Sequence, residues 1–142
     1  RQGSLKAPNH VGGGTVFGPR PRSYDFSPPK KVRRGAMCSA LSLFVKEDRL
    51  IVLNKLELKQ IKTAELAKVL GKLGADHALI IDSKENENLK LSARNLARHT
   101  FLPIEGINVL DILKHDQLIM TKDAVLAVQE RLERPVRSRR AS

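Results

Sequence analysis

The 142-residue sequence predicts an α/β body of three layers (α/β/α), with helices on both faces of a mostly parallel sheet of about four strands. From residue 50 onward, short apolar runs alternate with segments whose apolar residues recur at helical spacing. The connections are short. Two strands joined by a helix lie parallel in the sheet, and the connection between them is a right-handed crossover. The 98 residues from 35 to 132 are enough for one domain with its own core.

The first helix is expected to begin after Ser27-Pro28-Pro29, which offers a hydroxyl for the cap and prolines where no amide donor is needed. Cys38, the single cysteine, excludes an internal disulfide, and we expect it to be a small buried residue of this helix. A strand over residues 50–58 follows, because a branched apolar run continues into an alternation. The apolar stripe of the helix comprises Val32, Ala36, Met37, Ala40, Leu41, Phe44 and Val45.

A second helix is predicted from a cap at Thr63 to a stop at Gly74. Residues 78–82 form an apolar run that ends in an acid, which is typical of a strand buried on both faces. A third helix then carries apolar residues at helical spacing as far as Leu96.

The last third of the chain continues the alternation. A weaker strand is expected at residues 101–104, where Pro103 favours a strand end or an edge because it lacks an amide donor. Asn108, three residues before Asp111, predicts the cap of a short helix. Residues 117–120 make a fourth strand, and Thr121 caps a last helix that reaches Leu132.

Positive charge is concentrated at the two ends of the chain. Residues 1–34 carry eight Lys/Arg and one acid, a net charge of +7, and residues 133–142 carry +3. Residues 35–132 carry only +1, like an ordinary globular surface. The sequence therefore predicts an extended basic arm over 1–34, an α/β body over 35–132 and a basic C-terminal tail over 133–142.

The basic arm contains five prolines and a run of three glycines but no apolar periodicity, so it cannot bury itself. Its expected ordering partner is a polyanion, most naturally RNA. The prolines between Gly18 and Arg22 hold two arginines on a stiff, extended backbone. Four cations between residues 30 and 34 lie where a helix N-terminus disfavours them unless an anion binds. One Tyr and four Phe, without Trp, are few for an aromatic platform, so phosphate contacts should dominate.

An open parallel sheet binds ligands at the carboxyl ends of its strands, so Asp82, Ser83 and Thr121 are the positions where an enzyme's residues would lie. The sequence has no glycine-rich phosphate loop between a strand and a helix, and its four histidines lack ligand spacing. It therefore predicts no catalytic residue, cofactor or metal site, and no apolar run is long enough to cross a membrane. A small α/β nucleotide- or metabolite-binding enzyme with a basic tail is the alternative, and a basic-tailed protein adaptor is a third reading.

An ordered set of motifs covers nearly the whole chain: Arg1-Gln2-Gly3-Ser4, Gly12 to Arg22, Pro29 to Arg34, Ser39 to Ser42, Asn86 to Asn95, Gly106 to Asp111 and His115 to Thr121. This set closely resembles large-subunit ribosomal protein four of the bacterial type. The resemblance implies an α/β body on the ribosome surface and a long loop that penetrates the large-subunit RNA. That loop helps assembly and reaches the wall of the peptide exit tunnel.

The same resemblance implies a structural, non-enzymatic constituent of the large ribosomal subunit, in the mitochondrial matrix or the bacterial cytoplasm. Its partners would be large-subunit ribosomal RNA and neighbouring large-subunit proteins. Family members also have an N-terminal part of the body and an outgoing half of the loop before the stretch that starts at Arg1. We therefore expect a separate chain or a preceding segment to complete the body. The residues marked as RNA contacts are Arg1, Gln2, Ser4, Lys6, Asn9, His10, Arg20, Arg22, Lys30, Lys31, Arg33 and Arg34.

Overall fold

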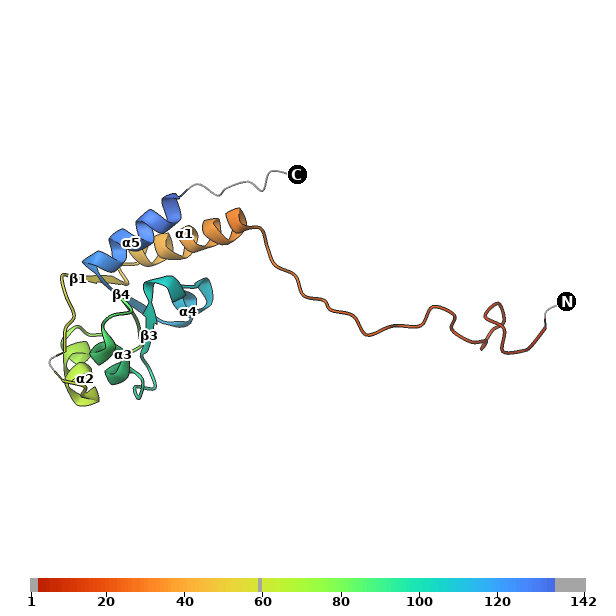
Figure 1. The fold of residues 1–142 in the computed structure, drawn as a ribbon, viewed down its shortest axis with the longest axis horizontal. Coiled ribbons are helices and arrows are strands. Elements are labelled where there is room, and N and C mark those ends of the chain that lie inside the picture. The colour runs from red at the N-terminus through yellow and green to blue at the C-terminus, as the bar shows by residue number, and fades with distance from the viewer. Residues whose placement is uncertain (1–2, 59, 135–142) are drawn as a thin grey trace.

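Four strands form a single sheet in the order β1-β4-β2-β3, and every neighbouring pair is parallel. The computed structural model, shown in Figure 1, describes residues 3–58 and 60–134. The strands are β1 (Leu50–Leu53), β2 (Ala78–Asp82), β3 (Thr100–Pro103) and β4 (Gln117–Thr121). The central strands β2 and β4 are aligned so that Ala78 lies opposite Gln117, and Ile81 lies opposite Met120.

Helices cover both faces of this sheet, which confirms the predicted three-layer α/β/α body. One core joins the sheet to α1, α4 and α5, and a second core joins its other face to α2 and α3. A short 3-10 turn, η1 (Ile104–Gly106), follows β3. The helices are α1 (Lys30–Lys46), α2 (Thr63–Lys72), α3 (Glu87–Ala93), α4 (Val109–Lys114) and α5 (Lys122–Glu133).

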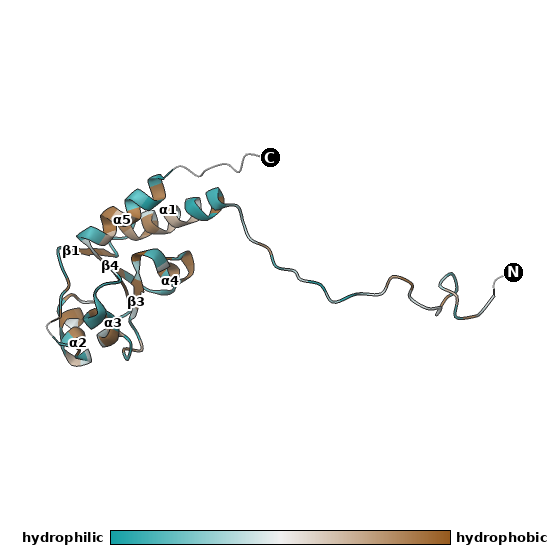
Figure 2. Ribbon diagram, viewed as in Figure 1, coloured by the Kyte–Doolittle hydropathy of each residue, from teal (hydrophilic) through white to brown (hydrophobic). Residues whose placement is uncertain are grey.

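Strand β2 lies at the centre of both cores, and all five of its residues are buried, as predicted. Successive side chains of a strand point to opposite faces. Leu79 and Ile81 therefore enter the core under α1, α4 and α5, whereas Ala78 and Ile80 enter the core under α2 and α3. Burial of each large side chain stabilises the fold by about 1.5–3 kcal/mol. Figure 2 shows the apolar colouring of the strands and the polar first turns of α1.

Four local signals in the sequence were confirmed. The side chains of Asn108 and Thr121 accept hydrogen bonds from the backbone amides three residues on and so cap α4 and α5. Gly74 follows α2 with φ of 68°, a conformation that favours glycine. Pro103 is the last residue of β3, an edge strand, as expected for a residue that lacks an amide donor.

Two predicted helix caps were wrong. Helix α1 starts after Pro29, so the hydroxyl of Ser27 lies too early in the chain, and no side chain caps this end. Helix α2 starts after Lys62, and Thr63 is its first helical residue. Helix α1 thus starts two residues later than the hydroxyl of Ser27 suggested, and helix α2 starts one residue earlier than the hydroxyl of Thr63 suggested. In both cases the cap position falls on a residue whose side chain cannot accept, Pro29 or Lys62.

The strand predicted over residues 50–58 and the third helix are both shorter than expected. β1 ends at Leu53 because only residues 50–53 pair with β4. Leu56 leaves the sheet but is still buried, in the core under α2 and α3. Helix α3 ends at Ala93, and Leu96 packs against the same core from beyond the helix end. Alternating apolar residues thus continue past the paired segment because the loop itself covers the core.

Helix α1 buries a narrower face than its apolar stripe suggested. Ala40 and Phe44 are buried, whereas Val32 and Val45 are 58% and 57% exposed. Cys38 is exposed, so the expectation that it is buried was wrong. It lies two residues before Ala40, which places it about 200° around the helix from that buried position. The N-terminal end of α1 extends beyond the sheet toward the arm (Figure 1).

Residues 3–29 extend away from the body as a long arm in which no residue is buried (Figure 1). The last residues of the predicted basic arm, from Lys30 to Arg34, are helical and belong to α1. The arm is therefore continuous with a helix whose other end is packed in the core.

Candidate nucleic-acid interface

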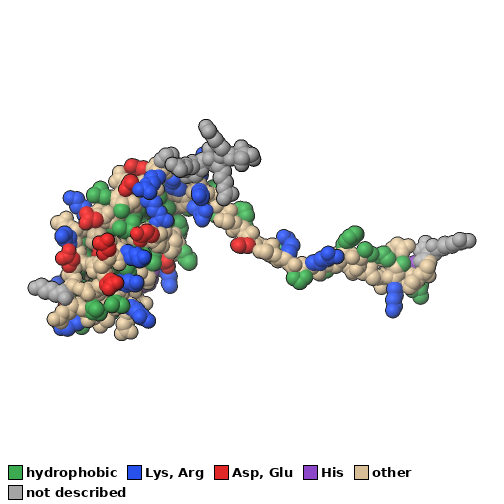
Figure 3. All heavy atoms as spheres, in the orientation of Figure 1, with side chains coloured by type: hydrophobic (Ala, Val, Ile, Leu, Met, Phe, Trp, Pro, Cys, Tyr) green, Lys and Arg blue, Asp and Glu red, His purple; other side chains and the backbone are tan. Residues whose placement is uncertain are grey.

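The extended part of the arm holds its cations in the open. Arg20 and Arg22 alternate with Pro19 and Pro21, and all four residues are exposed. Proline fixes φ near its extended value, so this backbone has little freedom left to lose on binding. Figure 3 shows Lys and Arg side chains spaced along the arm and gathered where it meets the body. The arrangement can contact successive phosphates along a nucleic acid.

Residues 4–14 form a compact hydrogen-bonded loop within the arm. The amide of Ala7 donates to the carbonyl of Ser4, and the amide of Gly14 donates to the carbonyl of Lys6, both at 2.9 Å. A Cβ at Gly13 would lie 2.0 Å from the Ala7 carbonyl oxygen, so this position excludes any side chain. At Gly13 the close approach is to the chain's own backbone, and the loop has a shape of its own.

Four of the predicted contact residues lie in this loop: Ser4, Lys6, Asn9 and His10. Ser4 accepts a hydrogen bond from the Lys6 amide at 3.2 Å, and the His10 amide donates to Ala7 at 3.1 Å. Asn9 lies in the same turn and makes its own interaction. The predicted contacts Arg1 and Gln2 lie outside the described residues.

A groove of about 610 Å³ lies where the arm joins the body, between α1, the start of α4 and the end of α5. Four cations line it: Lys30, Arg33, Arg34 and Arg131. Its floor is apolar and includes Met37, Ile107, Val109, Val128 and Leu132. Lys31 is exposed but does not line the groove. The structure thus brings three of the four predicted helix cations together and adds Arg131.

The basic N-terminal and C-terminal segments meet at this groove. The Arg34 guanidinium donates a hydrogen bond to the backbone carbonyl of Arg134. Arg134 also pairs with Glu130 at 2.7 Å, and this hydrogen bond raises the pKa of Arg134. The rest of the predicted basic tail, residues 135–142, lies outside the described residues. Positive charge from both ends of the sequence is therefore placed side by side at the root of the arm.

Arg131 was missed by the sequence reasoning, which counted it only as part of a balanced body. Its guanidinium donates to the carbonyls of Ile104 and Glu105 at 2.9 and 3.1 Å, so η1 fixes its orientation. The available signal was its position three residues after the buried Val128, on the same helix face. From that spacing alone, Arg131 is expected at the edge of the core. Its position across the groove from α1 becomes visible only in the folded structure.

The electrostatics of α1 favour an anion. No acidic residue lies in its first turn, and no side chain caps it. The free backbone amides of that turn carry the positive end of the helix dipole, and Lys30 and Lys31 add their charges to it. Phosphate oxygens at this end would accept from the amides and pair with the side chains.

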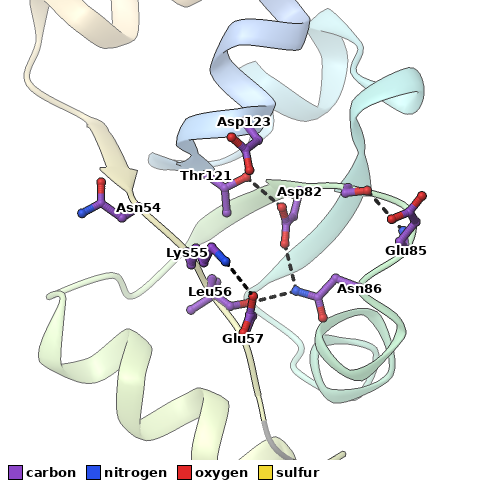
Figure 4. Close-up of a pocket in the computed structure, with 10 residues that line it drawn as sticks. Asn54, Lys55, Leu56, Glu57, Asp82, Glu85, Asn86, Thr121 and Asp123 are labelled. Carbon is purple, nitrogen blue, oxygen red and sulfur yellow. Dashed lines mark hydrogen bonds and ion pairs between the residues drawn. The ribbon is translucent and has the colours of Figure 1, made fainter.

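The carboxyl ends of the central strands hold a polar network centred on the carboxylate of Asp82. The Thr121 hydroxyl donates to one oxygen of Asp82 at 2.7 Å, and the Asn86 amide donates to the other at 2.9 Å. Asn86 also donates to the carbonyl of Leu56 at 2.8 Å and caps α3 (Figure 4). A cavity of about 340 Å³ adjoins this network, and Ser83 lines it. Both oxygens of the Asp82 carboxylate thus already accept hydrogen bonds from the protein.

The histidines of the body serve packing and hydrogen bonding. His77 and His115 are stacked with ring centroids 4.7 Å apart. His115 lies 2.7 Å from the Asp111 carbonyl and 3.0 Å from the Thr100 hydroxyl. His99 accepts from the amide of Ala78, and burial, followed by the charges of His77 and His115, lowers the pKa of His99.

Within residues 3–58 and 60–134, no group of three or more His, Cys, Asp or Glu side chains is placed to hold a metal ion. No helix in this described part is long and apolar enough to cross a membrane.

A small α/β body that carries a long exposed basic arm, with cations gathered at the arm's root, defines a structural protein of the RNA-binding class. Comparison with protein families identifies which family within this class the chain belongs to. Residues 1–131 match the Ribosomal protein L4/L1 family, and the chain belongs to this family. It is therefore a ribosomal protein of the large subunit, with a structural role in translation.

Proposed function

We propose that this protein binds large-subunit ribosomal RNA through the arm and the groove at its root, and that it supports assembly of the subunit near the peptide exit tunnel. The observation that carries the proposal is the arm itself. Residues 1–34 hold a net charge of +7, and none of residues 3–29 is buried. Outside the hydrogen-bonded loop of residues 4–14, a segment with that charge and no core of its own gains its structure from a polyanion.

The proposed contact residues divide into three groups along the arm. Ser4, Lys6, Asn9 and His10 are presented by the hydrogen-bonded loop, and Arg1 and Gln2 precede it. Arg20 and Arg22 lie on the extended segment that the prolines stiffen. The third group, at the helix start, consists of Lys30, Lys31, Arg33 and Arg34, and Arg131 joins it across the groove.

The body acts as the anchor of the arm and not as an enzyme. In the alternative reading, the strand ends would hold an open pocket with free polar groups for a nucleotide or metabolite. In this body, Thr121 and Asn86 occupy the carboxylate of Asp82 with short hydrogen bonds. The same contacts join the ends of β2 and β4 to the starts of α3 and α5 and so stabilise the body.

The proposed partners are large-subunit ribosomal RNA and the neighbouring large-subunit proteins, and the proposed location is the large subunit of a bacterial or a mitochondrial ribosome. The RNA contacts would be mainly to phosphates and sugars, which position a protein on a folded RNA. Such binding releases counterions and therefore weakens steeply as salt is raised.

The test is the affinity of the full chain for transcribed large-subunit ribosomal RNA at several salt concentrations. If about six to eight phosphates are neutralised, log affinity should fall with log salt at a slope of roughly −4 to −7. A variant with Arg20→Gln and Arg22→Gln should lower the magnitude of the slope by about 1.4–1.8. A slope near zero for the unaltered chain would overturn the proposal.

A further inference from the structure

Most of the aromatic side chains of this protein lie on the arm and not in the core. The chain has one Tyr and four Phe, and three of these five residues fall between positions 17 and 26. Phe17, Tyr24 and Phe26 are 93%, 77% and 82% exposed. Single exposed apolar residues are common on protein surfaces. Here three exposed aromatic rings lie within one ten-residue stretch of the basic arm. Phosphate binding does not explain this pattern, because aromatic rings do not pair with phosphates.

One of these rings already has a planar partner. The guanidinium carbon of Arg22 lies 3.8 Å from the centroid of the Tyr24 ring. A guanidinium stacks on an aromatic face in the same way as it stacks on a base. Because Tyr24 is still 77% exposed, most of its surface stays available to a second flat group.

We infer that Tyr24, with Phe17 and Phe26, forms a stacking site for unpaired nucleobases. The inference rests on the proposed RNA binding and adds a class of ligand group that the cations do not recognise. Arg20 and Arg22 lie between the rings in sequence, so a strand whose phosphates pair with them would bring its bases to the same segment. The small number of aromatic residues in the whole chain argued against such a platform, but their distribution concentrates them where a strand would pass.

Stacking and phosphate pairing make different physical predictions. Stacking on an aromatic side chain is worth about 1–3 kcal/mol per base and involves no charge, so it is independent of counterion release. Replacing Tyr24 by Leu should therefore weaken binding to RNA with unpaired bases by about 5- to 150-fold, while the slope of log affinity against log salt stays unchanged.

The experiment uses the 142-residue chain, because Tyr24 is its single Tyr and it has no Trp. Its intrinsic fluorescence therefore reports on this one ring. We expect quenching of this fluorescence when oligouridylate binds, and no quenching with inorganic polyphosphate, which offers charge without bases. Tyr24→Phe should keep the affinity for oligouridylate, whereas Tyr24→Leu should weaken this affinity by about 5- to 150-fold. Leu5→Ala is the matched control, because Leu5 is 86% exposed on the same arm but is not aromatic, and it should leave the affinity unchanged.

Three outcomes would overturn the inference: Tyr24→Leu binds oligouridylate as tightly as the unaltered chain, binding leaves the fluorescence unchanged, or Tyr24→Phe loses as much affinity as Tyr24→Leu. In each of these cases the unaltered chain still shows its salt-dependent binding, so the proposed function stands. Absence of salt-dependent binding in the unaltered chain would instead remove the proposed function, and the stacking site with it.

Discussion

The hydroxyl of Thr121 donates a 2.7 Å hydrogen bond to the carboxylate of Asp82, from which it is separated by 39 residues of sequence. The two residues end the neighbouring strands β4 and β2, so this bond crosses the sheet at its carboxyl edge. The same hydroxyl accepts from the amide of Ala124 at 3.4 Å and caps α5. One side chain thus joins the sheet edge to the helix that leads back to the root of the arm.

Asp82→Ala should destabilise the body by about 2 kcal/mol, because Thr121 and Asn86 would each lose a buried partner. Urea unfolding followed by circular dichroism measures this. Glu57→Ala is the control: Glu57 is 75% exposed and pairs with the equally exposed Lys55 in the same loop, so its loss should cost less than about 0.5 kcal/mol. Equal stability of the Asp82 and Glu57 variants would show that the network contributes little.

Stability of the body should fall as the pH is lowered through the His99 titration. Burial, helped by nearby His77 and His115, lowers the pKa of His99 below its ordinary value of 6.5. The unfolded chain therefore binds a proton at a higher pH than the folded chain does. The stabilising contribution is complete above pH 6.5 and is lost as the pH falls through 6.5 to the lowered pKa. The protonated ring carries a hydrogen on both nitrogens, so Nδ1 would also stop accepting from the Ala78 amide.

Unfolding midpoints in urea at about pH 8 and about pH 5 measure this effect. In a His99→Gln variant, the difference between the two midpoints should become smaller. His10→Gln is the control, since His10 lies on the arm away from the body and its replacement should leave the difference unchanged. An unchanged difference in the His99 variant would assign the pH dependence to other groups.

Replacing Lys30 and Lys31 by Gln should have opposite effects on folding and on RNA binding. The body should gain a few tenths of a kcal/mol per residue, because cations at a helix N-terminus are unfavourable. The magnitude of the salt slope should fall by about 1.4–1.8 if both residues contact phosphates. Thermal unfolding and the salt titration measure the two effects separately.

Lys46→Gln is the matched control for that pair. Lys46 lies in the last turn of the same helix, where a cation is favourable, so its loss should lower stability by a few tenths of a kcal/mol. The RNA salt slope should not change. If Lys46→Gln reduced the slope as much as the Lys30 and Lys31 replacements, the binding would be diffuse over the body surface.

Gly13→Ala should open the loop of residues 4–14, because the added Cβ would lie 2.0 Å from the Ala7 carbonyl oxygen. The Gly14 amide, which donates to Lys6, should then exchange its hydrogen faster, as measured by NMR. Gly35→Ala is the control: nothing lies within 4 Å of a Cβ there, and the change should stabilise helix α1 by about 0.5–1 kcal/mol. Slow exchange in the Gly13 variant would contradict the loop geometry.

Features that depend on neighbouring residues could be predicted from the sequence. Asn108, Thr121 and Gly74 act within one helical turn of themselves, so their roles were readable from spacing alone. The apolar run at residues 78–82 predicted a strand buried on both faces, because apolar side chains point to both sides of the sheet. The charge partition likewise identified the arm, since no long-range contact is needed to see that a segment cannot bury itself.

Features that depend on distant contacts could not be predicted. The burial of Leu56 depends on Leu66 and Leu70 in α2, which the loop happens to cover. The groove needs Arg131 to face α1 across the start of α4, an arrangement that only the order of the sheet decides. The exposure of Cys38 likewise depends on which face of α1 the sheet takes.

Helix α1 runs without a break over 17 residues, or about 25 Å, from Lys30 at the root of the arm to Lys46, and Phe44 near its end is buried in the core. A continuous helix has no hinge between the arm and the body. Once the arm is bound, the orientation of the body is fixed as well, so a single binding event would determine both the position and the orientation of the protein in the ribosome.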